Sequence, residues 1–434
     1  MRIGIIIGRI GGVDGVALET EKWIHVFQKM GHEVFILAGQ FEEREIDKEH
    51  ETRLPVLSFF SPECEWGQRK AFFDPDNDPG PLLEHVEKVS EGIADFIVNW
   101  CRQKKIDVIL SENASALACH LSMGLGIKKA VEKTGISIIT HDHDFHWERG
   151  DRYISSNNEI NPFIEETFPL QLPQVHHAVI NLDAKKTLKE KFGIDAVVVP
   201  NVMNFDLPYG EITEYNKRLK RDIGLNSDDI PLFQITRIVK RKGIEIAIEL
   251  VHKLQDKHIK LVITGNHNDD EAGKYYNFLL DKIYEFNLLD QVVFADDLIH
   301  NHAWEGIHGS KMYSLSDAYA HARACTYFST YEGFGNAFVE AVLSKTPIFV
   351  NNYKPVYMPD IGTKGFKTVM LDDNVLTDEA FNEMKEIIYD AKLNKEIGEY
   401  NYEIGKKYFS YTVLQELLDE LLNKVSTQSI QIVN

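Results

Sequence analysis

The 434-residue sequence has few cysteines and no long apolar run. The apolar stretch at its start spans only residues 2–7, which is too short for the core of a signal peptide or for a membrane span. The four cysteines stand far apart and form no Cys-x-x-Cys pair, so neither a disulfide framework nor a zinc ribbon is indicated. We therefore expect reduced thiols and a cytoplasmic protein with no integral membrane segment. The cysteines are Cys64, Cys101, Cys119 and Cys325.

Positive charge is also scarce, since 47 Lys and Arg residues face 67 Asp and Glu residues and the net charge is −20. Binding to nucleic acid is therefore disfavoured, and an anionic ligand requires cations that are concentrated locally. The sequence contains neither G-x-G-x-x-G nor G-x-x-x-x-G-K-[ST]. A nicotinamide-binding fingerprint and a P-loop are thus both unsupported.

The length exceeds what one hydrophobic core usually serves, so two domains are expected. Buried-strand patterns alternate with amphipathic helical patterns in two series, separated by a polar, irregular stretch near 201–229. This alternation predicts an α/β protein with two Rossmann-like, doubly wound parallel sheets and a ligand cleft between them. We place the domains at 1–205 and 206–407. The segment 408–434 carries leucines at helical spacing and is expected as a helix that packs back on the first domain.

The most specific segment is 329–341, with the sequence STYEGFGNAFVEA. It has the pattern of a strand end, a glycine turn and a helix start. Gly333 and Gly335 allow a ligand to approach the backbone, and free N–H groups at the helix start can bind a phosphate. Glu332 and Glu340 could hold hydroxyls on two parts of one polyol ligand. The alternative is an ordinary loop and helix with a solvated Glu340.

A cationic cluster follows the expected strand 232–236. Four of the six residues 237–242 are Lys or Arg, which supplies the local positive charge that a diphosphate requires. A solvated charged face is the alternative. We expect Lys240 and Arg241 to face solvent. Gly265, at the end of the next strand, could line a nucleotide pocket through backbone groups.

The segment 140–149, THDHDFHWER, is expected just past a strand and holds three His and two Asp residues within six positions. Such a cluster raises the alternative of a metal site. We predict none, because no second His/Asp cluster of comparable density could complete a coordination shell. Surface histidines in a capped loop are a further alternative. Trp147 is expected as an apolar platform for a sugar ring, and Arg149 or Arg152 as a grip for an anionic acceptor group.

The stretch EGFGNAFVEA resembles the E-x7-E motif of the retaining nucleotide-sugar glycosyltransferases of family 4, which have the GT-B fold. The order of expected elements is similar over nearly the whole chain. The resemblance implies that Glu332 contacts the donor hexose and that Glu340 holds the ribose hydroxyls. It also implies that five consecutive amides approach the sugar and the distal phosphate. These belong to Gly333, Phe334, Gly335, Asn336 and Ala337.

Other family positions carry over in the same way. The R-x4-K-G pattern implies that Arg237 and Lys242 bind the diphosphate, and His141 matches a histidine that faces the donor sugar. Gly11 and Gly12, in the glycine-rich turn expected at 8–15, match a loop that approaches phosphate.

The implied reaction moves a hexose from a nucleoside diphosphate sugar to an acceptor hydroxyl, with retention at the anomeric carbon. Cations and helix amides would stabilise the departing diphosphate, so neither a metal nor another cofactor is required. The expected partners are the nucleotide-sugar donor and a carbohydrate or small polar acceptor, anionic ones included. Alternatives are a disaccharide phosphorylase of the same fold, a non-catalytic sugar- or nucleotide-binding protein and, less favoured, a hydrolase that uses Glu332 and Glu340.

Overall fold

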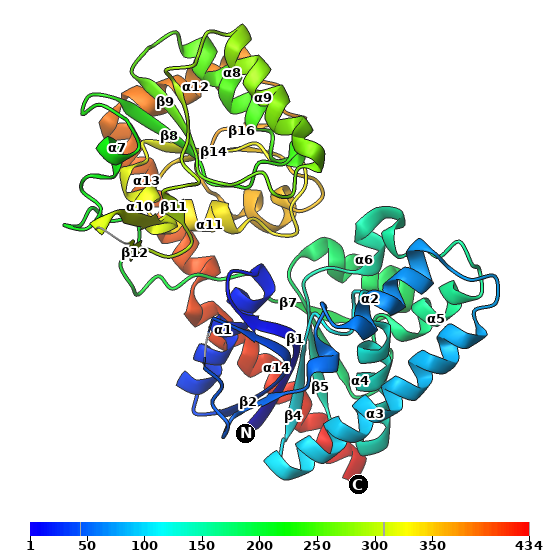
Figure 1. Cartoon of the computed structure of the whole chain (residues 1–434). Helices are drawn as coiled ribbons and strands as arrows, with labels where there is room; N and C mark the ends of the chain where they lie inside the picture. Colours follow the sequence, from blue (N-terminus) through cyan, green and yellow to red (C-terminus); the bar gives the residue numbers. More distant parts are fainter. Residues whose placement is uncertain (44, 307–308, 434) are drawn as a thin grey trace. The chain divides into compact units, whose positions relative to one another are not determined.

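The computed structural model describes residues 1–43, 45–306 and 309–433. It divides into two compact units, each built on a parallel sheet (Figure 1). Unit 1 comprises Met1–Val202 and Tyr411–Asn434, and unit 2 comprises Met203–Ser410. The last helix of the chain therefore belongs to the first unit. Within the described residues, no helix is long and apolar enough to cross a membrane.

Unit 1 contains a seven-stranded parallel sheet in the order β3-β2-β1-β4-β5-β6-β7. Its central strands are continuous apolar runs because helices cover both faces of the sheet. Ile5 and Ile7 face one core and Ile6 faces the other, as the alternation of side chains along a strand requires. The strands are β1 (Arg2–Gly11), β2 (Glu33–Glu42), β3 (Glu51–Arg53), β4 (Val108–Glu112), β5 (Ile138–Asp142), β6 (Val175–Val179) and β7 (Ala196–Val198).

Helices α1 and α14 cover one face of this sheet, and α3 and α4 cover the other (Figure 1). Leu414, Leu418 and Leu421 of α14 are fully buried against the first face. The helices are α1 (Gly15–Lys29), α2 (Pro62–Gln68), α3 (Gly80–Lys104), α4 (Leu121–Thr134), α5 (Ile160–Thr167), α6 (Leu182–Phe192) and α14 (Tyr411–Val433). Short helical turns are η1 (Pro55–Leu57), η2 (Arg69–Phe73) and η3 (His146–Tyr153).

Unit 2 contains a six-stranded parallel sheet in the order β10-β9-β8-β14-β15-β16. Its strands are β8 (Ile230–Gln234), β9 (Ile259–Ile263), β10 (Val292–Phe294), β14 (Ala324–Tyr327), β15 (Ile348–Asn351) and β16 (Met370–Leu371). Its helices are α7 (Leu219–Asp222), α8 (Ile244–Leu254), α9 (Lys274–Glu285), α10 (Leu315–His321), α11 (Asn336–Leu343), α12 (Asp378–Tyr389) and α13 (Ala391–Phe409). Short helical turns are η4 (Lys240–Lys242), η5 (Glu271–Gly273), η7 (Tyr357–Ile361) and η8 (Gly362–Lys364).

A small sheet of three short strands lies between β10 and α10 in the chain. It pairs β11 (Ile299–His300), β12 (Trp304–Glu305) and β13 (Lys311–Ser314). The sequence pattern predicts a helix over 312–321, and its first three residues are wrong because they belong to β13. The helix begins only after Ser314, because the Ser314 and Asp317 side chains cap each other's backbone N–H groups.

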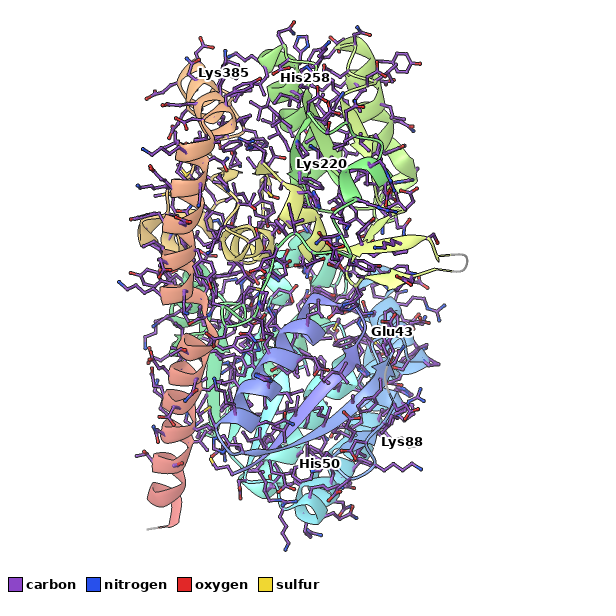
Figure 2. The ribbon with its side chains drawn as sticks, turned by 90° about the vertical axis from the view of Figure 1, so that its left-hand side faces the viewer. Glu43, His50, Lys88, Lys220, His258 and Lys385 are labelled. Atoms are coloured by element: carbon purple, nitrogen blue, oxygen red, sulfur yellow. The ribbon has the colours of Figure 1, made fainter. Side chains whose placement is uncertain are left out.

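The glycine-rich turn expected at 8–15 is also shorter than predicted. Strand β1 continues to Gly11, which pairs with Glu42 of β2, and α1 begins at Gly15. Asp14 caps that helix by accepting hydrogen bonds from two backbone N–H groups. Glu43 and Lys88 are among the charged residues exposed at the surface (Figure 2).

Candidate functional site

The loop between β14 and α11 in unit 2 brings Glu332 next to two cations. The Glu332 carboxylate forms an ion pair with Lys242, and its Oε2 lies 3.1 Å from Nη1 of Arg241. Arg241 also donates a 2.9 Å hydrogen bond to the Tyr331 carbonyl. We expected Arg241 to face solvent; its side chain is 37% exposed, but the expectation missed the pairing of its guanidinium with Glu332. The 3₁₀ turn η4 directs Arg241 and Lys242 together toward this loop.

The cluster is buried, with 11% of the Glu332 side chain and 9% of the Lys242 side chain exposed. Burial alone would raise the pKa of Glu332, but the charges of Lys242 and Arg241 outweigh burial and hold that pKa below its ordinary value. Burial lowers the pKa of Lys242, and Glu332 opposes that shift. An ionised carboxylate and the Lys242 ammonium are thus buried together at the carboxyl edge of the sheet, and the more exposed Arg241 pairs with the same carboxylate.

Helix α11 begins at this loop, and the positive end of its dipole favours an anion there. Gly335 precedes the helix at φ +137°, a conformation that residues with a Cβ rarely adopt. A Cβ at Gly335 would lie 2.2 Å from the hydroxyl of Tyr353. At Gly335, the middle of the predicted ligand-contacting backbone, the chain is therefore closely packed against Tyr353.

Arg237, in contrast, does not reach Glu332. Its guanidinium pairs with Asp269 and its side chain is 58% exposed. Gly265 lies just beyond the end of β9, where a Cβ would stand 2.1 Å from the Thr236 carbonyl oxygen. Glycine there allows close backbone packing at the carboxyl ends of β8 and β9. Nucleotide contacts by Arg237 and Gly265 remain predictions.

Glu340 lies one turn inside α11 and has a partner that the sequence did not reveal. The Tyr319 hydroxyl lies 3.2 Å from both Oε2 of Glu340 and the Ala337 carbonyl oxygen. Burial, and then the charge of Glu340, raises the pKa of Tyr319 well above its ordinary value, so the hydroxyl is a proton donor. No spacing pattern marks Tyr319, because it comes from α10 and meets α11 only in the folded unit.

In unit 1, His141 belongs to strand β5 and not to the loop after it, which corrects the expected strand end. The strand continues to Asp142 because it pairs with β4, and Glu112 of β4 lies opposite His141. Nδ1 of His141 lies 3.0 Å from Oε2 of Glu112, and the His141 ring stacks on Trp23 at a centroid distance of 4.0 Å. Burial would raise the pKa of Glu112, but the adjacent His141 and His143 lower it to about 2.

His143 follows directly after β5 and completes this group. Its Nε2 lies 3.7 Å from Oε2 of Glu112, and its ring lies 4.2 Å from that of His141. The sequence analysis missed Glu112. The only available signal was its position at the end of the strand next to the His-rich segment.

The expected acceptor residues lie beyond the same strand. The Trp147 ring stacks on Phe145 at 4.6 Å, and the Lys191 ammonium lies 4.9 Å from its centroid. A sugar ring would have to displace one of these neighbours to use the indole as a platform. Arg149 pairs with Asp144 and is 53% exposed. Arg152 lies over the Phe73 ring at 5.9 Å.

Gly11 and Gly12 hold the chain close to β2. Both have positive φ, +88° and +64°, and a Cβ on Gly11 would lie 2.1 Å from the Glu42 carbonyl oxygen. The neighbouring Arg9 is paired with Asp14 at 2.6 Å and with Glu42 at 3.7 Å. Positive φ and close packing against Glu42 therefore explain why glycine stands at these two positions. Their contact with phosphate remains a prediction.

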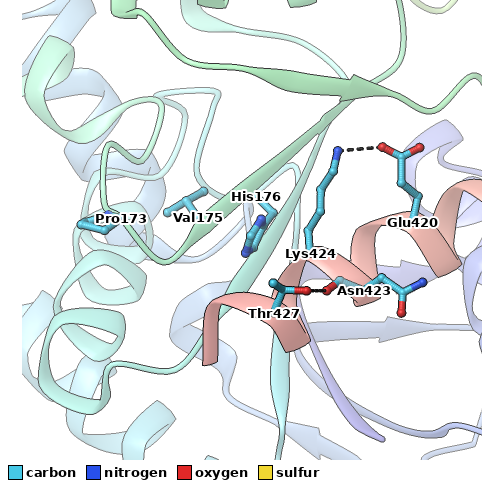
Figure 3. A pocket seen from close by; sticks show the side chains of 7 residues that line it. All are labelled: Pro173, Val175, His176, Glu420, Asn423, Lys424 and Thr427. Atoms are coloured by element: carbon cyan, nitrogen blue, oxygen red, sulfur yellow. Dashed lines mark hydrogen bonds and ion pairs between the residues drawn. The ribbon is translucent and has the colours of Figure 1, made fainter. Parts of the chain in front are cut away.

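A groove of about 650 Å3 lies elsewhere in unit 1, between the start of β6 and α14 (Figure 3). Glu420 and Lys424 pair across one turn of its helical wall at 2.7 Å. Because β6 begins at Val175, the groove lies at the amino end of that strand. It is thus separate from the carboxyl-edge residues described above.

The chain is similar to known glycosyltransferases in sequence. The family described as glycosyl transferases group 1 matches residues 216–404, which lie in unit 2. The mannosylglucosylglycerate synthase of Thermotoga maritima is 31% identical, over 96% of this chain and 99% of that protein. The protein of the same name from Petrotoga mobilis is 30% identical, over 86% of each. The chain belongs to the group 1 glycosyltransferases.

A solved glycosyltransferase structure from Rickettsia africae matches this glycosyltransferase over 98% of both chains, with a TM-score of 0.68 and 15% identity. That likeness concerns the fold. The expectation of two parallel-sheet α/β units of the GT-B type is confirmed.

Proposed function

We propose that this glycosyltransferase moves a mannosyl group from a nucleoside diphosphate mannose to a glucosylglycerate-type acceptor, with retention of anomeric configuration. The names of the two relatives support the product, mannosylglucosylglycerate. The resemblance to family 4 supports the stereochemistry. The donor would bind to unit 2 and the acceptor to unit 1.

The observation that carries the proposal is the cluster of Glu332, Lys242 and Arg241 beside the start of α11, in which Glu332 and Lys242 are buried. In this proposal Glu332 accepts hydrogen bonds from hexose hydroxyls, and Glu340 accepts them from the ribose. Lys242, Arg241 and the helix amides neutralise the charge that gathers on the leaving diphosphate. Arg237 would join them once it leaves Asp269. No metal on the diphosphate and no other cofactor is needed.

The acceptor in this proposal contains glycerate, whose carboxylate is ionised at neutral pH. Arg149 and Arg152 are the cations that the proposal assigns to it, because a guanidinium binds a carboxylate through two parallel hydrogen bonds. Arg152 contacts aromatic rings and forms no ion pair among the described residues, so its charge is available. His141 stays the predicted neighbour of the hexose.

The test is product formation by the purified full-length chain. It is incubated with glucosylglycerate and, in turn, the GDP and UDP forms of mannose and glucose, and products are identified by mass spectrometry. We expect mannosylglucosylglycerate from one mannose donor. Lack of product with every donor, together with phosphate-dependent cleavage of a disaccharide, would replace the proposal with a phosphorylase.

A further inference from the structure

Three side chains with metal-binding atoms converge at the carboxyl ends of β4 and β5. They are Glu112, His141 and His143, and one ligand atom from each lies within 4.8 Å of the other two. Glu112 and His141 are opposite each other in register, and the chain after β5 brings His143 to the same place. The backbone of two adjacent strands thus positions the group.

Several polar atoms of this group are buried and have no hydrogen-bond partner among the described residues. They are Oε1 of Glu112, Nε2 of His141 and Nε2 of His143. Buried polar atoms are nearly always satisfied, and a buried carboxylate is costly without a compensating charge. No Lys or Arg in the described part of the chain forms an ion pair with Glu112, whose partners are the two imidazoles.

We propose that Glu112, His141 and His143 bind one divalent transition-metal ion, with Zn²⁺ as the preferred ion. Two imidazoles and a carboxylate are a common zinc ligand set, whereas Mg²⁺ prefers oxygen ligands alone. Tetrahedral zinc–ligand bonds of about 2.0–2.2 Å place two ligand atoms of one ion about 3.3–3.6 Å apart. Oε2 of Glu112 lies 3.0 Å from Nδ1 of His141 and 3.7 Å from Nε2 of His143, so small side-chain shifts bring both pairs to that spacing.

Three protein ligands leave one zinc position for water or for a ligand oxygen. Trp23 stacks on the His141 ring and fixes its plane, which is how surrounding groups orient a metal ligand. All three ligands belong to unit 1, and zinc binding to them is measured without any donor, so it can fail independently of the proposed transfer. It revises the expectation from sequence that the chain holds no metal, because Glu112 supplies the ligand that the His-rich segment alone lacked.

The experiment uses full-length protein that has been treated with a chelator, dialysed and then exposed to Zn²⁺ alone. Elemental analysis after a second dialysis measures zinc per chain, and thermal unfolding measures the shift on binding. We expect about one zinc per chain and a raised melting temperature. Less than one tenth of a zinc per chain would overturn the proposal, and a buried hydrogen-bonded Glu–His pair would then explain the cluster.

Substitutions of the proposed ligands test whether zinc binds at this site. His143→Ala removes the most exposed ligand and should lower zinc affinity at least tenfold, while the melting temperature of the metal-free variant reports whether the fold is intact. Glu112→Gln provides the second test at a buried position. His258→Ala is the matched control, because His258 lies beside Asp228 and Asp229 in the other metal-type cluster of the described residues (Figure 2). Zinc binding that survives in both test variants, or that is lost in the control, would overturn the assignment.

Discussion

At the scale of single residues, Glu332 is expected both to support transfer and to pair with the cations that bind the diphosphate. A conservative substitution can separate these two roles. Glu332→Gln keeps the shape of the side chain but removes the charge that binds Lys242 and Arg241. We expect the transfer rate to fall about 10²- to 10³-fold, the range seen when one stabilising polar group is removed from an active site. The affinity for the bare nucleoside diphosphate should be unchanged or higher, because the two cations lose a competing anion.

Calorimetric titration with the nucleotide and a rate assay test both parts of this expectation. Glu285→Gln, at an exposed position of α9, is the matched control and should change neither quantity. A Glu332→Gln enzyme with normal turnover would remove Glu332 from the reaction. A tenfold loss of nucleotide affinity would show that Glu332 does not compete with the diphosphate.

Glu148 gives unit 1 a pH-dependent stability. Burial raises the pKa of its carboxyl to about 7, while its Oε2 accepts a hydrogen bond from the Phe145 backbone. Between about pH 4.5 and 7 the folded chain holds a proton that the unfolded chain has lost, so the free energy of unfolding falls as pH rises through this window. The loss is at most about 1.4 kcal/mol per unit of pKa shift.

Glu148→Gln should therefore flatten this dependence and stabilise unit 1 at pH 8, since glutamine still accepts the hydrogen bond from Phe145. Urea unfolding of both proteins at pH 5 and pH 8 measures the difference. If the variant and the natural chain lose the same stability between these pH values, the raised pKa of Glu148 is refuted.

At the scale of elements, the start of α11 depends on a glycine that no other residue can replace. Gly335→Ala places a Cβ against the Tyr353 hydroxyl and forces an unfavourable backbone angle. We expect a loss of about 1–3 kcal/mol in unfolding free energy and at least a tenfold loss of nucleotide affinity. Gly365→Ala is the control, because Gly365 also has positive φ but open space around it. Equal nucleotide affinity in the two variants would show that the turn at Gly335 does not contribute to nucleotide binding.

The sequence predicts the bounds of single helices and strands better than the contacts between residues of different elements. The apolar patterns predict α8 at 244–254 and β10 at 292–294 as the structure has them, because burial of one face decides such elements locally. The pairing of β4 with β5 depends on sheet register, so the apposition of Glu112 and His141, 29 residues apart, could not be read from spacing. Arg241 was missed similarly, since its contact with Glu332 arises from the turn η4.

At the scale of the whole molecule, the terminal helix α14 completes the core of unit 1, although unit 2 separates it from the rest of unit 1 in the sequence. Leu418 is fully buried there among residues of the β1 face. Leu418→Ala should destabilise unit 1 by about 2–5 kcal/mol, the usual cost of such a cavity. Glu416→Ala, at an exposed position of α14, should change little. Calorimetric unfolding measures both, and an unchanged profile for Leu418→Ala would argue that α14 does not stabilise unit 1.

Although the whole chain is acidic, it offers cations to an anionic ligand at one local site. A net charge of −20 repels anions, yet Lys242 and Arg241 lie together beside Glu332 in the loop that leads into α11. The sequence indicated a cationic cluster at this strand end. It could not show that a buried carboxylate shares the place, because Glu332 is 90 residues away along the chain.

The most direct test of the central claim is the anomeric configuration of the first product. A proton NMR time course follows the full-length chain with a nucleoside diphosphate α-mannose and glucosylglycerate. The account predicts that an α-mannosyl product appears as the nucleoside diphosphate is released, and that Glu332→Gln forms it about 10²- to 10³-fold more slowly. A β-mannosyl product would contradict retention. Release of free mannose without any transfer to the acceptor would contradict the proposed glycosyl transfer itself.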